Sequence, residues 1–396
     1  MKTLIELFDS EQLENLIAGL HFLPQKIVFV GFKNLMRPKK QELMEQIFSE
    51  HGAISVEYEY VSRNDFAQIV GRFNEIIDRN EDCCFDLTGG KDVVIAAMGA
   101  VAAQRNIPII RYDVKKGSLI RVKDCECLEE DEIPYLTLEE TFHLNGGSIV
   151  SGGPGFSWNL NADFSKDIDT IWSICSRNCT AWNRHAIAMA GISGRFDMDE
   201  SFSVCADLRD RPILPDWDIM RELVNAGLLL NYQKRGGSVS FCYKNEQVFH
   251  ALTKSGNALE VYTYLIAKEL WEEGHFHDVK NGVMADWDGV IQTRYSTKKE
   301  TRNEIDLMMM RGIIPIFASC KNGEVHKEAL YELQTVARRF GGKYARKMLL
   351  ATNLGPNELA CEFIRQRAVD MKICVIEGIN KMSRDAFKSA LKEATK

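Results

Sequence analysis

The segment NEIDLMMMRGIIPIFASCKNG, residues 303–323, places charged side chains at regular positions within two apolar runs. Side chains two positions apart in a β-strand point to the same face, so Glu304 and Asp306 share one face. The second apolar run ends in Lys321. Charged groups are rarely buried without a partner, because removing them from water is costly. We therefore expect two paired strands that bring Asp306 near Lys321, either as a structural ion pair or as a site.

The surrounding sequence predicts a mixed α/β domain around these two strands. Two further acids are able to converge on Asp306: Glu260, near the start of an amphipathic helix, and Asp288, in the motif DWDG. The expected order is a helix, three strands, a helix, a strand, a helix and a last strand, over 257–273, 282–295, 303–312, 313–321, 327–342, 343–352, 357–371 and 373–378.

The clustered acids suggest a chemistry for this region. Carboxylates repel one another, and their pKa values rise unless they share a cation. Mg²⁺ and Mn²⁺ prefer oxygen ligands, and a divalent ion offsets the charge that builds up during phosphodiester hydrolysis. A lysine at the same point orients the attacking water or stabilises the transition state. The residues therefore favour a metal-dependent nuclease site, with an Asp–Lys pair that only joins two strands as the alternative.

The first 125 residues alternate short apolar strands with helical patterns, which is typical of a doubly wound, Rossmann-like parallel sheet. Among its helices we expect one capped by Ser10 and one capped by Asn64. Ligands of such sheets bind beyond the carboxyl ends of the strands, where the strand order reverses. If the first strand is central, the loops at 8–12 and 87–92 flank that point.

The second of these loops, TGGK, has the residues of a phosphate seat. Gly89 and Gly90 let the backbone approach a ligand closely, and the following helix offers free N–H groups. Thr88 can donate a hydroxyl hydrogen bond, and Lys91 supplies a positive charge. A tight turn between strand and helix, without a ligand, is the alternative interpretation of the same residues.

The middle of the chain reads as a linker followed by a spacer. Residues 126–165 carry clustered acids and then clustered glycines. Beyond them, a helix that ends near Gly227 and two short strands that meet at KRGG outline a winged helix. Its helices carry little positive charge, so we interpret it as a spacer rather than a DNA reader. We expect three domains, at 1–147, 148–250 and 251–396.

The composition is that of an ordinary folded protein, with 45% hydrophobic and 27% charged residues among 396. No apolar run reaches the ~18 residues that a membrane span needs, and the first residues lack the apolar core of a signal peptide. We therefore expect a cytoplasmic protein without membrane contact, whose eleven cysteines are reduced thiols.

The charge distribution favours a polyanionic partner more than the net charge of −7 does. Between Ile291 and Lys347, twelve lysines and arginines outnumber six aspartates and glutamates. These basic residues flank the acids of the quoted segment on both sides, and such a local excess attracts nucleic acid.

The order of elements, with Glu260, then Asp306, then a strand that ends in Lys321, resembles the PD-(D/E)xK nuclease superfamily. The passage ELQTVARRFGGKYARKMLLAT, 332–352, is similar to that of its Mrr and Holliday-junction-resolvase branch. The N-terminal sheet with DLTGGKD, 86–92, resembles CARF domains, the sensors of cyclic oligoadenylates in type III CRISPR systems. Together the parts resemble CARF effector nucleases over essentially the whole chain.

The resemblance implies an endonuclease of DNA or RNA, dependent on Mn²⁺ or Mg²⁺, which acts in antiviral defence. It implies catalytic roles for Asp306 and Lys321, and metal binding by Asp306 and Glu260. The sequence departs from the motif at Ser319, where an acid is usual. We expect the missing ligand to be replaced from a small set of residues: Glu304, which we also count as catalytic, Asp288 and the carbonyl of Cys320.

For the sensor, the resemblance implies a homodimer that binds cyclic tetra-adenylate as an allosteric activator. A ligand with two-fold symmetry suits a groove across a symmetric dimer. The residues that match ligand-binding positions are Asp9 and Ser10 in the first loop and Thr88, Gly89, Gly90 and Lys91 in the second.

Two other functions fit the same residues. A nucleotide-sensing DNA-binding regulator with an inactive nuclease fold would explain Ser319. Alternatively, the sensor itself cuts the activator, with Lys91 and Asp9 as the available acid–base groups.

Overall fold

The computed structural model describes residues 1–52, 54–114, 116–123, 134–150, 158–194, 202–209, 211–287 and 302–396. The chain forms two compact units. The first comprises Met1–Ser148 together with two later pieces, Gly312–Ile314 and Arg339–Tyr344. The second comprises Ile149–Arg311, Pro315–Arg338 and Ala345–Lys396, so the winged-helix region and the C-terminal region share one unit. A functional division into three domains stays a prediction.

The first unit is built on a six-stranded sheet in the order β3-β2-β1-β4-β5-β6. Neighbouring strands are parallel except for β5 and β6, which are antiparallel. β1 and β4 therefore lie side by side where the order reverses, as the sequence predicts. The strands are β1 (Thr3–Leu7), β2 (Lys26–Gly31), β3 (Ser55–Tyr60), β4 (Cys83–Asp86), β5 (Ile109–Asp113) and β6 (Ser118–Lys123).

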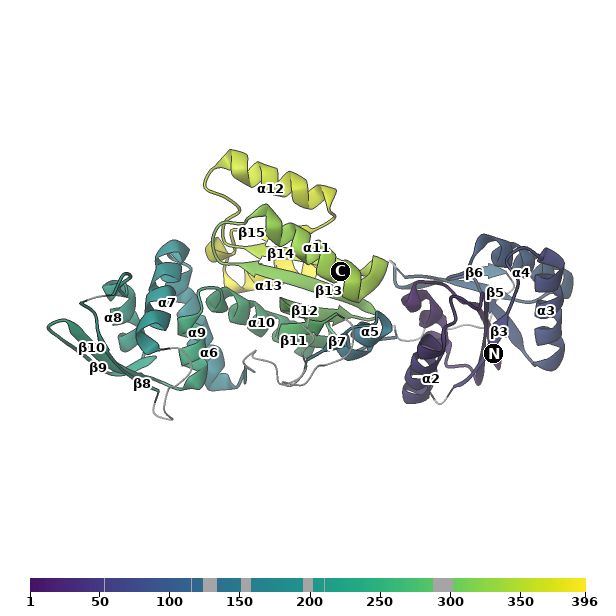
Figure 1. The fold of residues 1–396 in the computed structure, drawn as a ribbon, viewed down its shortest axis with the longest axis horizontal. Helices are drawn as coiled ribbons and strands as arrows, with labels where there is room; N and C mark the ends of the chain where they lie inside the picture. The colour runs from purple at the N-terminus through teal and green to yellow at the C-terminus, as the bar shows by residue number, and fades with distance from the viewer. Residues whose placement is uncertain are drawn as a thin grey trace, which may run out of the picture. The chain divides into compact units, whose positions relative to one another are not determined.

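Helices cover both faces of this sheet (Figure 1). Apolar residues of α3 and α4 form one core with Ile5, Val28 and Phe85, and Phe48 of α2 packs near Phe29 on the opposite face. The alternation of buried side chains along each strand produces these two cores. The helices are α1 (Ile17–Phe22), α2 (Pro38–Gly52), α3 (Phe66–Arg79), α4 (Asp92–Arg105) and α5 (Leu138–Leu144).

Two expected helix caps are wrong. Ser10 caps no helix, because the chain forms a 3₁₀ turn, η1 (Gln12–Asn15), before α1, and the Ser10 hydroxyl donates to Asp9 instead. Helix α3 is capped by Asp65 rather than Asn64, and the Asp65 carboxylate accepts the Gln68 N–H at 2.9 Å. Asp and Asn cap helices about equally well, so the sequence alone did not decide between adjacent residues.

In the structure the linker is shorter than the range 126–165 that the sequence predicts. Helix α5 begins with a capping box, in which Thr137 and Glu140 satisfy each other's backbone N–H groups, and β7 (Ser148–Ile149) follows. The acids at 129–132 lie outside the described residues.

The second unit contains a sheet in the order β15-β14-β13-β12-β11-β7. β11 and β12 are antiparallel, whereas β13, β14 and β15 are parallel. The strands are β11 (Asp278–Asp286), β12 (Arg302–Arg311), β13 (Ile314–Lys321), β14 (Arg346–Ala351) and β15 (Cys374–Glu377). The order of these elements along the chain is the one expected, but the first strand lies at Asp278–Asp286 rather than 282–295, and β14 begins at Arg346 rather than at position 343.

Helices also cover both faces of this second sheet. Helices α10 and α13 share one core with strand residues such as Leu307 and Ala318, and α11 lies on the other side of the sheet (Figure 1). The helices are α10 (Asn257–Glu272), α11 (Lys327–Gly341), α12 (Glu358–Asp370) and α13 (Arg384–Ala394). Within the described residues, no helix combines the length and the apolar character that a membrane crossing requires.

The region before α10 has the expected winged-helix outline. A hairpin of β9 and β10 follows α8, and β8 pairs with β10 to make a three-stranded antiparallel sheet. Its core is continuous with α10, since Trp182 and Phe241 belong to the same apolar cluster as Leu265. The elements are α6 (Ala162–Cys175), α7 (Cys179–Ser193), β8 (Ser203–Asp207), α8 (Trp217–Asn225), β9 (Leu229–Arg235), β10 (Ser238–Tyr243) and α9 (Glu246–Thr253).

Candidate functional site

Strands β12 and β13 bring Asp306 and Lys321 together. The Asp306 Oδ2 atom lies 3.4 Å from Lys321 Nζ and accepts the Cys320 backbone N–H at 2.7 Å and the Ser319 hydroxyl at 3.2 Å. The Asp306 side chain is 17% exposed and that of Lys321 is 36% exposed. Three donors therefore fix one carboxylate oxygen while the pair remains open to solvent.

Glu260 lies beside this pair, in the first turn of α10. Its side chain is buried, and the pKa of its carboxyl is raised to about 7, first by burial and then by the charge of Asp306. Gly256 makes room for it, because a Cβ at that position would overlap the Glu260 Oε1 atom. A buried carboxyl with a raised pKa is costly to ionise, so a further cation would stabilise its charged form.

Lys254 is a second lysine of the site, which sequence analysis missed. Its Nζ lies 3.0 Å from Glu304 Oε1 and 3.6 Å from Glu260 Oε2. Burial lowers the pKa of Lys254, but Glu260 and Glu304 reverse that effect, and the net shift is upward. The ammonium therefore stands between two carboxylates, where a bound cation would also lie.

Two pockets meet at Glu304. A small one is lined by Asp306, Ser319 and Lys321 together with Glu332 of α11. The other, of about 340 Å³, is lined on one side by Glu260, Lys254 and Asn257 and elsewhere by Trp158, His250, Thr253, Asn281, Gly282 and Met284. Glu304 lines both pockets and is the residue that they share.

The oxygen donors of this region match the chemistry of a divalent ion. Glu260, Glu304 and Asp306 supply hard carboxylate oxygens, which Mg²⁺ and Mn²⁺ prefer. Across the described part of the chain, however, no three His, Cys, Asp or Glu side chains are gathered closely enough to hold a metal. Lys254 instead pairs with both Glu260 and Glu304, and Lys321 pairs with Asp306. Asp288, the remaining expected ligand, lies outside the described residues.

Cys320 takes part through its backbone. Burial raises the pKa of its thiol well above the ordinary value, and the charge of Asp306 adds to the effect, so the sulfur stays protonated. The role expected for the Cys320 carbonyl stays a prediction. Its N–H already holds Asp306 in place.

A second candidate site lies in the first unit, at the carboxyl ends of β1 and β4. Asp9 is its central residue: Oδ2 accepts Lys91 Nζ at 3.0 Å and the Gly90 N–H at 3.2 Å, while Oδ1 accepts the hydroxyl of Ser10. Burial alone would raise the pKa of Asp9, but hydrogen bonds from the Glu11 backbone, Lys91 and Ser10 bring it below its usual value. The two loops that the sequence singled out are thus joined by one carboxylate.

The turn after β4 is held by Asp86. Its Oδ1 accepts both the N–H and the hydroxyl of Thr88, and the Thr88 oxygen in turn accepts the Tyr112 N–H at 2.8 Å. Burial raises the pKa of Asp86 to about 7. Gly90 has φ +113°, and a Cβ there would lie 2.6 Å from Leu7 Cδ1, so this position requires glycine.

These residues line an open pocket of about 630 Å³ that also contains residues the sequence analysis missed. Arg111 of β5 and Lys343 contribute positive charges, and Glu11 and Glu14 contribute negative ones. Lys343 belongs to the first unit although it follows α11 in sequence. In this pocket Lys343 contacts Glu14, which lies 329 positions earlier in the sequence. No pattern within either segment predicts this contact.

No family model and no curated protein matches the sequence. Solved structures, in contrast, do match this chain. Protein VC1899 from Vibrio cholerae superposes with a TM-score of 0.77 at 15% identity, over 99% of this chain and 98% of its own. Can2 from Sulfobacillus thermosulfidooxidans, solved in complex with cyclic tetra-adenylate, gives 0.68 at 15% identity, over 100% and 99%. The chain therefore shares its whole fold with these proteins.

Proposed function

We propose that this chain is a cyclic oligoadenylate-activated, metal-dependent endonuclease of CRISPR antiviral defence. The observation that carries the proposal is the Asp306–Lys321 pair, open to solvent, with buried Glu260 beside it. A pair that only joined two strands would need neither the additional acids nor the adjoining pockets. The fold that the chain shares with Can2, a protein solved with cyclic tetra-adenylate, supports the proposal that the sensor binds such a ligand.

The chain's own residues have defined tasks in phosphodiester hydrolysis. Asp306, Glu260 and Glu304 would hold the divalent ion once Lys254 leaves its place between Glu260 and Glu304, with Asp288 as a further candidate. When bound, that ion supplies charge neutralisation at the phosphorus oxygens and an activated water. Lys321 donates hydrogen bonds to the attacking water or to the phosphoryl oxygens as their charge grows. The Cys320 N–H and the Ser319 hydroxyl keep Asp306 in the orientation that this requires.

In the sensor, the turn Thr88–Lys91 and the loop at Asp9 and Ser10 would bind phosphates and riboses of cyclic tetra-adenylate. Gly89 and Gly90 let the backbone come close to the ligand. Two copies of the turn, one from each protomer of a homodimer, match the two-fold symmetry of the ligand. The ligand activates only if it binds the active arrangement more tightly than the inactive one.

A cleavage assay tests the proposal directly. Single- and double-stranded DNA and RNA are incubated with the protein, with and without cyclic tetra-adenylate, in Mn²⁺, Mg²⁺ or chelator. We expect cleavage that requires the metal, increases with the cyclic nucleotide and disappears in Asp306→Asn. Asp370→Asn, on the surface of α12, is the matched control and should cleave like the wild type. Cleavage in chelator, or in Asp306→Asn, would overturn the proposal.

A regulator with an inactive nuclease fold is the second candidate. Ser319 favours it, because the hydroxyl that donates to Asp306 stands where an acid would serve as a ligand. This candidate predicts binding of one duplex sequence that is sensitive to salt and independent of metal, with no cleavage under any condition. It would replace the first proposal if that pattern were observed.

A further inference from the structure

The charges around the sensor pocket do not suit a polyanion unless Lys343 is counted. Among the described residues that line it, the acids are Asp9, Glu11 and Glu14, and the cations other than Lys343 are Lys91 and Arg111. A ligand with several phosphates would then enter a pocket with more negative than positive side chains. With Lys343, the positive and negative side chains of the pocket are equal in number, which removes a repulsion that would oppose phosphate binding.

Lys343 is held at the pocket by Glu14. Its Nζ lies 2.5 Å from Glu14 Oε1, and the hydroxyl of Tyr344 donates to the same oxygen. The Glu14 side chain is 9% exposed, whereas that of Lys343 is 53% exposed. An ammonium group has three N–H donors, and Glu14 accepts one of them. The others remain able to reach a phosphate from the open side of the pocket.

The backbone around Lys343 is fitted to the first loop as well. Its N–H donates to Glu11 Oε2 at 3.3 Å. Gly342 has φ +66°, and a Cβ there would lie 2.5 Å from Glu11 Oε1. The short 3₁₀ turn η2 (Gly342–Tyr344) therefore contacts Glu11 and Glu14, and the positive φ of Gly342 favours glycine there.

The turn η2 directly continues α11. Residues Lys327–Arg338 of this helix belong to the second unit, and Glu332 among them lines the pocket of Asp306 and Lys321. The residues after them, from Arg339 to Tyr344, belong to the first unit. One uninterrupted segment thus contributes to the walls of both pockets, and a helix transmits a displacement of its end along its length.

We propose that Lys343 is a phosphate-binding residue of the sensor pocket and that η2 transmits the occupancy of this pocket to α11. The inference rests on the proposed function, because it takes a cyclic oligoadenylate as the ligand. It adds a residue from beyond the sensor sequence to the binding site, and it names the segment by which the ligand regulates the nuclease.

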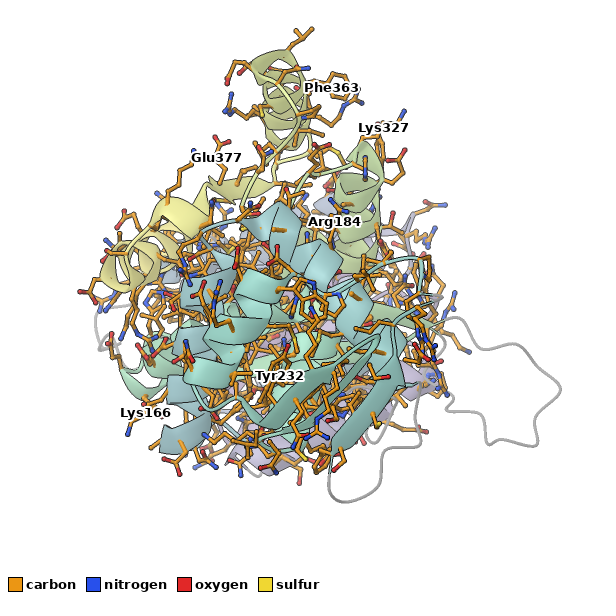
Figure 2. All side chains as sticks on the ribbon, turned by 90° about the vertical axis from the view of Figure 1, so that its left-hand side faces the viewer. Lys166, Arg184, Tyr232, Lys327, Phe363 and Glu377 are labelled. Carbon is orange, nitrogen blue, oxygen red and sulfur yellow. The ribbon has the colours of Figure 1, made fainter. Side chains whose placement is uncertain are left out.

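The binding test uses the full chain and isothermal titration with cyclic tetra-adenylate. Lys343→Ala should weaken binding about tenfold, the usual effect of losing one charge-assisted hydrogen bond. Lys343→Arg keeps the charge and should recover most of the affinity. Lys166→Ala is the matched control: Figure 2 shows Lys166 extending outward from α6, far in sequence from the pocket, and this variant should bind like the wild type.

Hydrogen exchange tests the transmission without relying on cleavage. In the wild type, the ligand should slow exchange of α11 amides over 327–338 as well as around Lys343. In Lys343→Ala saturated with ligand, the slower exchange of the α11 amides over 327–338 should disappear. Thermal unfolding of each variant verifies that it is folded.

The outcomes separate the two proposals. If the wild type binds cyclic tetra-adenylate and Lys343→Ala binds it equally well, the role of Lys343 is overturned and the proposed function stands. If the ligand does not change the exchange rates of the α11 amides in the wild type, transmission through η2 is overturned. If the wild type binds no cyclic oligoadenylate at all, the proposed function fails and this inference fails with it.

Discussion

Lys321 Nζ lies 3.4 Å from Asp306 Oδ2 at the exposed end of β13, so a charged pair is presented to a pocket rather than sealed in a core. Its lysine is therefore available to a substrate. We expect Lys321→Ala to lower the cleavage rate by roughly 100-fold or more, as removal of a transition-state donor usually does. Gel-based cleavage at saturating Mn²⁺ measures this.

The control for that variant is Lys327→Ala. Figure 2 shows Lys327 extending outward, and it lies at the start of α11, only six positions further along the chain. Its cleavage rate should equal that of the wild type. Equal rates for Lys321→Ala and Lys327→Ala would show that the Asp306–Lys321 pair is only structural.

Lys254 should compete with the metal. Because its ammonium stands between Glu260 and Glu304, a divalent ion has to displace it to bind both. We expect Lys254→Ala to bind Mn²⁺ up to roughly fivefold more tightly, since a partly exposed ion pair contributes about 1 kcal/mol or less. Titration calorimetry on the nucleotide-free protein measures the affinity. Weaker Mn²⁺ binding in this variant would instead make Lys254 a supporting residue of the metal site.

Gly90 and Gly99 offer a matched pair in adjoining elements. Gly90→Ala places a methyl group against Leu7 and strains a backbone at φ +113°, so we expect cyclic tetra-adenylate binding to fall at least tenfold. A Cβ at Gly99, inside α4, meets open space, and Gly99→Ala should stabilise the protein by about 0.5–1 kcal/mol. Titration calorimetry and thermal unfolding compare the two. Unchanged binding in Gly90→Ala would remove the turn from the ligand site.

Asp86 should make the stability of the first unit depend on pH. Burial raises its pKa from 3.8 to about 7, so the folded chain holds this proton more tightly than the unfolded chain does. The stability that this provides is complete below pH 4 and is lost as the pH rises through 7. Asp86→Asn retains an acceptor for Thr88 and should raise the free energy of unfolding at pH 8 by up to about 4 kcal/mol.

Urea unfolding between pH 4 and 8 measures this effect. The difference between Asp86→Asn and the wild type should widen as the pH rises. Asp78→Asn, an exposed residue of α3, should follow the wild type at every pH. A constant difference between Asp86→Asn and the wild type across this range would mean that Asp86 does not titrate there.

The sequence predicted those features that depend on local periodicity. Alternation along 303–321 was enough to pair Asp306 with Lys321, because a strand repeats every two residues and the hairpin between them is short. Alternation with helices predicted the parallel type of the first sheet, and the condition that its first strand is central, which the sheet meets, places the Asp9 and Thr88 loops at the reversal point.

What the sequence did not predict are contacts set by tertiary packing. Lys254 precedes α10 in a turn without periodic signal, and only the position of β12 brings it to Glu304. Lys343 reaches Glu14 across 329 positions, so nothing in either segment reveals the pair. At the start of α1, the segment after Asp9 turns as a 3₁₀ helix because Asn15 bonds the Asp9 backbone twice, which a pattern of apolar residues does not encode.

Helix α11 also restricts how this chain can evolve. Each residue in an α-helix advances the direction of the side chains by about 100°, so inserting or deleting one residue between Glu332 and Gly342 would swing Lys343 away from Glu14. If Lys343 has the proposed role, the number of residues in this helix therefore matters more than the identity of most of them.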